Sequence, residues 1–420
     1  MSSCSSIILK NNENVTFVSN PSITYFKSVY RKHTKFSIDY KEEFPDGNNS
    51  FDLKTLAEIK IPFHYTADLL CDISLKVQFK VPGALFRPPD DIALHLIKDI
   101  TFNLQGHINE FDKLDKEYIN FNAMLNNHNS SKATYTLTPT GKLTCNNGNN
   151  FQNMALCGGI GGEWGGRALD ADTAIGGLDN IKSMDAIIPL PFAFSKSIGT
   201  AIPLCAFNQT TTTPQIVITA VPLDRIDFGQ GSHKEEIMGS FTYSAISKYI
   251  FLSNEEITRF KTTRSEYLYE RVNSFITKKT TGGPINISRL NKKNPIKQIF
   301  IHVGSDDEDK EILHTLEYNM SINNEGMFSE NFSHEFFSKV EILNKFKGYI
   351  SQYTRSLSIG IIDFSLKNTQ GPSGCVSPSD NNIILNIKKS SSGKSFDITI
   401  YTVCYYILRI SDGELTHVFN

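Results

Sequence analysis

The sequence predicts an all-β protein made of two consecutive antiparallel sandwiches with few short helices. Apolar and polar residues alternate along many short segments, and Phe, Tyr, Ile and Val are abundant. Turns that contain Pro or Gly separate these segments. A chain of 420 residues also exceeds the usual size of one core, so two domains of about 200 residues each are expected.

The alternation is clearest in two segments. In residues 69–81, Leu, Cys, Ile, Val and Phe occupy every second position, and Asp, Ser, Lys and Gln occupy most of the others. Residues 396–410 repeat this pattern, which is typical of strands that bury one face. One helix is predicted over residues 253–267, where Ser253 and Glu256 form a capping box. Shorter strands are predicted at residues 97–105, 215–221, 296–303, 361–367 and 383–387.

A polar segment is predicted to separate the two domains. Residues 1–22 are expected to form an N-terminal arm, residues 23–224 the first sandwich, residues 225–240 a linker and residues 241–420 the second sandwich. Within the first sandwich, residues 126–185 are rich in Asn, Thr and Gly and lack a sustained period. A long insertion of this kind is typical of a surface excursion with a role of its own.

Composition and charge narrow the possible functions. The chain has 42 Lys and Arg against 44 Asp and Glu, so it has no strong field for nucleic acid or an anionic membrane. Its seven cysteines are scattered and include no C-x-x-C pair, which indicates a reducing compartment. The N-terminus lacks the basic and apolar regions of a signal peptide, and no apolar run reaches the roughly 18 residues of a membrane span. We therefore expect synthesis in the cytosol.

The sequence contains fragments of catalytic and cofactor-binding motifs, but their residues do not have the spacing that these motifs require. Residues 393–395 (GKS) resemble the end of a P-loop, but Lys388 occupies the place of its first glycine. The glycines of residues 158–166 fail the dinucleotide spacing, because Trp164 takes the third position. There is no H-x-x-x-H pair and no G-x-S-x-G, and nothing argues for a triad assembled from distant residues. We expect no catalytic residue, cofactor or metal site; the acidic run at residues 305–309 is read as a solvated turn rather than a cation site.

Residues 20–36 (NPSITYFKSVYRKHTKF) carry a resemblance to a known family. They resemble the N-terminal signature of the major capsid proteins of nucleocytoplasmic large DNA viruses, which reads roughly N-P-Q-I-T-F-F-K-x-V-Y-R-R-H-T-N-F. Further similar segments follow in the family's order, among them IPLPFAF, QGPSG and YYILRI, so the resemblance spans nearly the whole chain. These segments lie within residues 96–112, 188–204, 249–269, 363–386 and 405–410.

The resemblance implies a double jelly roll, that is, two consecutive eight-stranded antiparallel jelly-roll sandwiches. It also implies a structural capsid protein of a large icosahedral double-stranded DNA virus, not an enzyme, whose homotrimers are pseudo-hexagonal capsomers that tile the shell. The implied partners are copies of the chain, neighbouring capsomers, and minor capsid and penton proteins. Direct nucleic acid binding and membrane insertion are not implied, although such a shell can overlie an internal membrane. The implied location is the virion, after synthesis and assembly in the host cytoplasm.

The signature segment is predicted to be an ordered element that contacts neighbouring subunits. Aromatic side chains grouped with Arg are typical of interface cores, although any one of these residues could instead fill the core of its own subunit. The predicted interface residues are Asn20, Pro21, Tyr25, Phe26, Tyr30, Arg31, His33, Phe36, Pro372, Ser373, Gly374 and Arg409.

Other classes of protein stay open. The residues after Ile410 depart from the family's S-G-M-x-G-L-A, so the chain could be a minor or paralogous capsid protein of low copy number. An assembly scaffold of the poxvirus type uses the same double barrel and would occur only in immature particles. A jelly-roll carbohydrate binder or enzyme would need a concave site with converging aromatic or carboxylate groups, for which Trp164 is the one tryptophan.

Overall fold

The structure is a computed structural model of the 420-residue chain. Residues Met1–Lys35 and Phe36–Asn420 form two separate compact units, and the first is described only at residues 26 and 32–35. The described residues of the second unit are 36–47, 57–63, 67–80, 94, 96–105, 108–119, 122, 135–137, 143–145, 150–151, 183–207, 213–222, 242–280, 285–288, 294–304, 315–328, 330–346, 359–366, 372–378, 382–389, 396–411 and 413–418.

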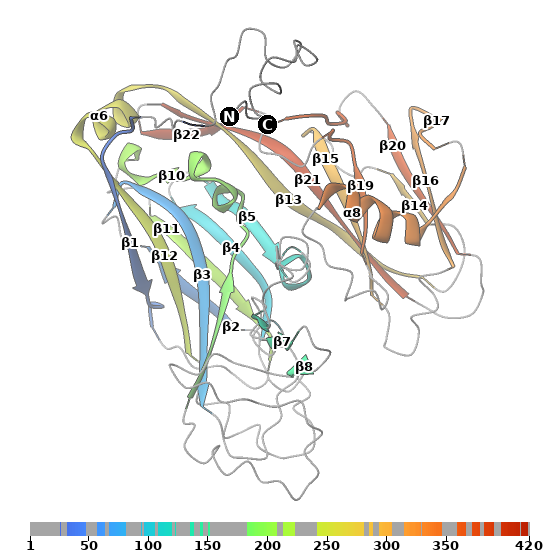
Figure 1. Ribbon diagram of the computed structural model, residues 1–420, viewed down its shortest axis with the longest axis horizontal. Helices are drawn as coiled ribbons and strands as arrows, with labels where there is room; N and C mark the ends of the chain where they lie inside the picture. Colours follow the sequence, from blue (N-terminus) through green and yellow to red (C-terminus); the bar gives the residue numbers. More distant parts are fainter. Residues whose placement is uncertain are drawn as a thin grey trace, which may run out of the picture. The chain divides into compact units, whose positions relative to one another are not determined.

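The first sandwich contains two antiparallel sheets (Figure 1). One sheet has the order β1-β12-β3-β10, with β9 also paired to β3, and the other has the order β2-β11-β4-β5. The strands are β1 (Phe36–Glu43), β2 (Ala57–Pro62), β3 (Leu69–Lys80), β4 (Ile97–Gln105), β5 (Ile108–Asp115), β9 (Ser183–Pro189), β10 (Ile202–Pro203), β11 (Thr213–Ala220) and β12 (Thr242–Leu252). Three short 3-10 helices accompany them, η3 (Ala193–Lys196), η4 (Ile198–Thr200) and η5 (Leu204–Ala206).

The second sandwich follows the same plan. Its sheets have the orders β13-β21-β15-β19, with β22 added to β21, and β14-β20-β16-β17, with β18 added to β16. The strands are β13 (Ser265–Thr280), β14 (Ile285–Ser288), β15 (Ile296–Gly304), β16 (Leu316–Ile322), β17 (Glu325–Gly326), β18 (Phe332–Ser333), β19 (Ile359–Asp363), β20 (Ile383–Lys389), β21 (Phe396–Ser411) and β22 (Glu414–His417). The π-helix η8 (Phe336–Val340) and helix α8 (Glu341–Lys345) lie beside β19.

The two sandwiches repeat one topology, position by position. In each, the first strand pairs with a strand from the end of the sandwich, β1 with β12 and β13 with β21, and that strand also pairs with the third, β3 or β15. In a jelly roll, two sheets face each other and the first strand of the sandwich pairs with a strand from its end. The predicted double jelly roll with little helix is therefore confirmed. The count of eight strands in each sandwich stays a prediction, since short strands pair at several edges.

One predicted domain boundary is wrong. β12 was assigned to the second sandwich, but it pairs with β1 and β3 in the first. The polar segment at residues 225–240 lies between β11 and β12, two strands of the same sandwich, so it marks a connection within a domain. The chain passes to the second sandwich through helix α6 (Asn254–Thr262), which leads from β12 to β13. A polar break in a sequence indicates a connection but not which sheet the next strand joins.

Two other predictions can be compared with the structure only in part or agree with it only in part. The helix predicted over residues 253–267 is α6, which is shorter, and β13 begins at Ser265. Ser253 occupies the N-cap position, but its side chain makes no capping hydrogen bond, so the capping box is wrong. Glu255 and Glu256 still favour the helix start, because negative charge stabilises that end. The 126–185 excursion lies largely outside the described residues, which there form β6 (Tyr135–Leu137), β7 (Leu143–Cys145), β8 (Asn150–Phe151) and the start of β9.

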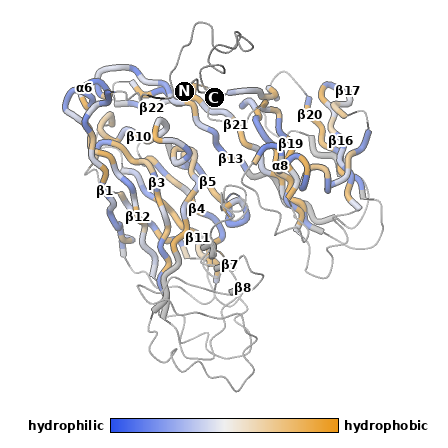
Figure 2. The backbone as a smooth tube through the Cα atoms, viewed as in Figure 1, coloured by the Kyte–Doolittle hydropathy of each residue, from blue (hydrophilic) through white to orange (hydrophobic). Residues whose placement is uncertain are grey.

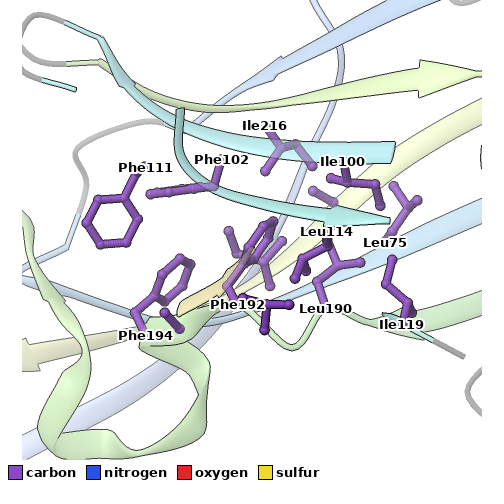
Figure 3. Packing of buried hydrophobic residues seen from close by; sticks show 14 of the residues in the cluster. Leu75, Ile100, Phe102, Phe111, Leu114, Ile119, Leu190, Phe192, Phe194 and Ile216 are labelled. Carbon is purple, nitrogen blue, oxygen red and sulfur yellow. The ribbon is translucent and has the colours of Figure 1, made fainter. Parts of the chain in front are cut away.

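The core of the first sandwich is built around Phe102 on β4. Hydrophobic and hydrophilic residues alternate along the strands, as Figure 2 shows, so each sheet directs one face inward. Phe102 is fully buried, and its ring centroid lies 4.8 Å from that of Phe194, 5.6 Å from Phe192 and 5.9 Å from Phe111 (Figure 3). Phe63 is the fourth ring, 6.3 Å away. The segment that follows β9 therefore closes this core with aromatic side chains.

Candidate assembly surfaces

Aromatic side chains join the two sandwiches within the chain. Phe111 on β5 lies edge-on to Tyr269 on β13, with ring centroids 5.5 Å apart. Tyr118, in the helical turn after β5, lies 6.3 Å from Phe300 on β15 and 6.0 Å from Tyr401 on β21. All five side chains are buried in one hydrophobic cluster that spans both sandwiches. We call this contact the intersandwich joint.

A buried charge network reinforces the intersandwich joint. Glu270 on β13 accepts a 2.6 Å hydrogen bond from Nζ of Lys297 on β15, and its other oxygen lies 3.4 Å from Nζ of Lys196 on η3. The Lys297 side chain is only 2% exposed, and its ammonium group lies 6.0 Å from the ring centroid of Tyr405. Because Lys196 belongs to the first sandwich and Lys297 to the second, the Glu270 carboxylate connects the two sandwiches.

Asp112 on β5 adds a buried carboxylate to the joint. Its oxygens accept hydrogen bonds from the backbone N–H of Ala193 at 2.8 Å and of Lys113 at 3.0 Å, and Nε of Arg271 on β13 lies 3.9 Å away. Burial raises the pKa of Asp112 to about 6, and the positive charges of Arg271 and Lys196 oppose the rise. The carboxyl group therefore titrates in a mildly acidic range.

The stability of the protein should depend on pH through Asp112. Because its pKa rises on folding from 3.8 to about 6, the protonated form favours the folded state. This contribution is fully present below pH 3.8 and is lost as the pH rises through 6, by about 3 kcal/mol at most. Urea unfolding of wild type and Asp112→Asn at several pH values should show the variant gaining relative stability as the pH rises. A difference between them that is independent of pH would contradict the assignment.

β1 carries apolar side chains on the face that points away from the core. Ile38 pairs with Ile250 and Tyr40 with Lys248, and directly paired residues share a face of a sheet. Tyr249 packs into the core, so its neighbours along β12 lie on the opposite face. Ile38 is 47% exposed and Tyr40 is 65% exposed. We call these two side chains the β1 face; neither is among the interface residues predicted from the sequence.

The second sandwich has exposed apolar side chains at the end away from β13. Met327 follows β17, Val340 ends η8, and Leu366 follows β19. They are 43%, 46% and 85% exposed, respectively. We call these three residues the distal face. Figure 1 shows β17 at the right edge of the second sandwich and β1 at the left edge of the first.

The predicted interface residues of the signature are partly described. Asn20, Pro21, Tyr25, Tyr30 and Arg31 lie outside the described residues. Phe26 is exposed, and Nδ1 of His33 lies 2.8 Å from the carbonyl oxygen of Thr34. Phe36 begins β1 and is 55% exposed, next to the β1 face. A role for these residues in subunit contacts stays a prediction.

Pro372, Ser373 and Gly374 lie together beside the distal face. The carbonyl oxygen of Ser373 accepts a hydrogen bond from the backbone N–H of Leu366, at 3.3 Å. Gly374 has φ +154°, and a Cβ atom there would overlap the carbonyl oxygen of Phe364. The sequence motif therefore has a local structural reason, which is that only glycine lets the loop approach the end of β19 this closely.

Replacing Gly374 by alanine should lower the free energy of unfolding by about 1–3 kcal/mol, because the backbone at Phe364 must move to admit the methyl group. Thermal unfolding followed by circular dichroism would measure the loss. Gly199→Ala is the matched control, since its Cβ would meet only Oγ of Ser197, at 3.5 Å. Equal stabilities of the two variants would contradict the close approach.

Arg409, the last predicted interface residue, lies in an exposed ion pair within the chain. Its Nε and one terminal nitrogen each lie 2.8 Å from Oε1 of Glu266, which also accepts from Arg264. The hydrogen bond from Arg409 is the main cause that lowers the pKa of Glu266. The structure thus pairs Arg409 on β21 with Glu266 on the neighbouring strand β13.

The described part of the chain shows no group of three or more His, Cys, Asp and Glu side chains arranged to hold a metal ion. None of its described helices is long and apolar enough to cross a membrane. Three segments considered in the sequence lie outside the described residues. They are the acidic run at residues 305–309, Trp164 and the GKS segment at residues 393–395.

Comparison with known proteins identifies the first sandwich. Residues 24–220 match the family described as "Major capsid protein N-terminus". This segment of the chain is therefore similar to the N-terminal part of major capsid proteins. The resemblance found in the sequence is thereby confirmed, and the matched residues run from the signature to the end of β11.

Relatives match a larger part of the chain, and solved structures share its fold. Capsid protein 1 of Acanthamoeba polyphaga mimivirus is 25% identical over 307 residues, 69% of this chain and 46% of that protein. The major capsid protein of Pyramimonas orientalis virus is 27% identical over 302 residues, 69% of this chain and 62% of that protein. The match thus spans about half to three fifths of these relatives. The crystal structure of PBCV-1 VP54 aligns with TM-score 0.70 and 19% identity over 94% of this chain and 100% of that one, which shows the same fold.

Proposed function

We propose that this chain belongs to the major capsid protein family and is a structural capsid protein of a large icosahedral double-stranded DNA virus, and not an enzyme. Three copies form a pseudo-hexagonal trimer that tiles the shell. The trimers contact neighbouring capsomers, minor capsid proteins and penton proteins. The protein is made and assembled in the host cytoplasm and resides in the virion.

One observation carries this proposal. The structure aligns with the whole length of the VP54 chain, so both sandwiches correspond to those of a capsid protein, not the first alone. Three chains of two similar sandwiches present six similar units around a three-fold axis, and such an outline fills a flat lattice. Contacts within an obligate trimer are expected to bury on the order of 2,000 Å² or more in total.

The mass of the purified full chain in solution tests the trimer. Light scattering after size exclusion should give three times the mass of one chain, and negative-stain images should show a compact particle with a hexagonal outline. A chain that stays monomeric at every concentration would contradict the proposal. Counting copies in purified virions tests the role in the shell, because a copy number far below that of the main tile would assign the chain to a minor capsid component.

A further inference from the structure

The intersandwich joint contains a buried carboxylate without a hydrogen-bonded counter-ion. Asp112 on β5 is 1% exposed, and among the described residues its hydrogen-bond donors are the backbone N–H groups of Ala193 and Lys113. Nε of Arg271 lies 3.9 Å from Oδ1 of Asp112, beyond hydrogen-bonding distance, and makes no hydrogen bond within the described part of the chain. A charged Asp112 is therefore desolvated in the joint without a direct partner of opposite charge.

Arg271 does not depend on Asp112 for its place in the joint. Its guanidinium carbon lies 5.4 Å from the ring centroid of Tyr406, on the neighbouring strand β21. One of its terminal nitrogens lies 3.8 Å from Oε1 of Glu110, a carboxylate that is 59% exposed. An aromatic ring and a solvated carboxylate both stabilise a guanidinium group. A neutral Asp112 would therefore not leave the charge of Arg271 uncompensated.

Opening of the joint would change the surroundings of Asp112 without breaking its hydrogen bonds. Ala193 lies on η3 and Lys113 on β5, so both donors belong to the same sandwich as Asp112. The second sandwich contributes β13, which packs against β5 and η3. Separating β13 would give the carboxyl group access to water and leave its two donors in place. Because water stabilises the charged form, the carboxyl group holds its proton more tightly in the closed joint than in the open one.

The elements around Asp112 carry further ionisable groups. The positive charges of Arg271 and Lys196 favour the charged form of Asp112, but burial outweighs them and raises the pKa of Asp112 to about 6. The other groups of the joint are Glu110 and Lys113 on β5, Tyr118 in the turn after it, Glu270 on β13 and Lys297 on β15.

We propose that Asp112 is a proton-dependent clasp of the intersandwich joint, which closes more tightly in mildly acidic solution than at neutral pH. The inference concerns a contact within one chain, so it does not depend on the proposed trimer. The contribution of the proton is fully present below the ordinary pKa of 3.8 and is lost as the pH rises through about 6. The two sandwiches therefore separate more readily at neutral pH.

His302 on β15 acts in the opposite direction. Burial lowers the pKa of His302 from its usual 6.5, and the negative charge of Glu117 opposes this change. Glu117 lies in the helical turn after β5, so this pair also crosses the joint. The neutral imidazole favours the closed joint, and its contribution is lost as the pH falls through the lowered pKa. Removing His302 should therefore widen the pH dependence that Asp112 produces.

Hydrogen exchange of the full chain at about pH 5 and about pH 7.5 tests the clasp, because it measures local opening. β5 and β13 are edge strands of their sheets and meet at the joint. After correction for intrinsic exchange rates, the amides of β5 and of residues 265–273 should be about tenfold less protected at the higher pH. A pKa that rises from 3.8 to about 6 produces a change of this size between these two pH values. β16, in the core of the second sandwich, is the reference and should not change.

Variants of the full chain identify the titrating group. Asp112→Asn keeps the size of the side chain, removes its titration and should abolish the pH difference. Asp99→Asn is the matched control, since it makes the same change at a buried carboxylate on β4 that bonds Thr219 within the first sandwich, and it should keep the difference. His302→Gln should widen the difference. Arg271→Gln removes a positive charge that opposes the rise in the pKa of Asp112, so the pH midpoint of the change should move upward.

Three results would overturn the clasp. Protection of β5 and β13 that is independent of pH would show that Asp112 does not control the joint. An equal change in β16 would mean that the whole chain unfolds, not that the joint opens. A pH difference that persists in Asp112→Asn would assign the effect to another group. If that variant did not fold, the Arg271→Gln midpoint would decide, because an unchanged midpoint contradicts the clasp. None of these results bears on the trimer, which the mass in solution tests separately.

Discussion

Replacing Glu270 by alanine should destabilise the protein by about 3–5 kcal/mol, because removing one partner of a buried ion pair leaves the other charge uncompensated. Lys297 is buried and lies 2.6 Å from Glu270, so its ammonium group would lose its carboxylate without gaining water. Lys196 would lose the same carboxylate from the other sandwich. Urea unfolding of wild type and variant would measure the difference. The double variant Glu270→Ala with Lys196→Ala should show the loss as well, because the Lys297 charge is left without its carboxylate in both proteins.

Two further variants identify the cause. Glu266→Ala removes a carboxylate from the same strand, but water screens its exposed pair with Arg409, so the loss should be much smaller. Glu270→Met combined with Lys297→Met replaces both charges by apolar side chains and should recover most of the stability. If the double variant were as unstable as Glu270→Ala, the stranded charge would not be the reason for the loss.

Replacing Phe102 by alanine should lower the free energy of unfolding by about 3–5 kcal/mol, because the substitution removes a fully buried ring and leaves a cavity. Phe63, Phe111, Phe192 and Phe194 surround this ring, so the cavity cannot close without moving several strands. Thermal or denaturant unfolding would measure the effect.

Phe44→Ala is the matched control for the Phe102 prediction. It makes the same chemical change at a side chain that is 64% exposed, where it should alter stability by less than about 0.5 kcal/mol. Losses of similar size in the two variants would mean that the packing around Phe102 does not determine the effect.

The sequence alone predicted several of the strands that show clear alternation, but it did not predict β1, β12 or β13. The segment predicted at residues 69–81 is β3 (Leu69–Lys80), and the one at 97–105 is β4 (Ile97–Gln105). The segment at 361–367 is wrong at its end, because β19 ends at Asp363 and the chain then turns toward residue 373. Alternation is a local property, since successive side chains of any strand point to opposite faces, and a sequence displays it directly.

The sequence did not indicate the charge network of the intersandwich joint, because its residues lie far apart along the chain. Glu270, Lys297 and Lys196 look like ordinary polar residues of strands and turns. The pairing of β13, β21 and β15 brings Glu270 and Lys297 together, and the packing of η3 against β13 adds Lys196. The β1 face could have been suspected from the apolar residues at positions 36, 38 and 40. Their exposure, however, depends on which face of β1 points into the core, and the pairing with β12 decides this.

The sequence by itself thus determined the class of fold, several strands with strong alternation and the resemblance to major capsid proteins. The tertiary structure decided that β12 closes the first sandwich, that Glu270 connects the two sandwiches and that Ile38 and Tyr40 are left exposed. The physical reason is the range of the interactions. A strand's pattern is written in its own residues, whereas its partner in a jelly roll comes from the far end of the domain, as in the pairing of Phe36 with Leu252.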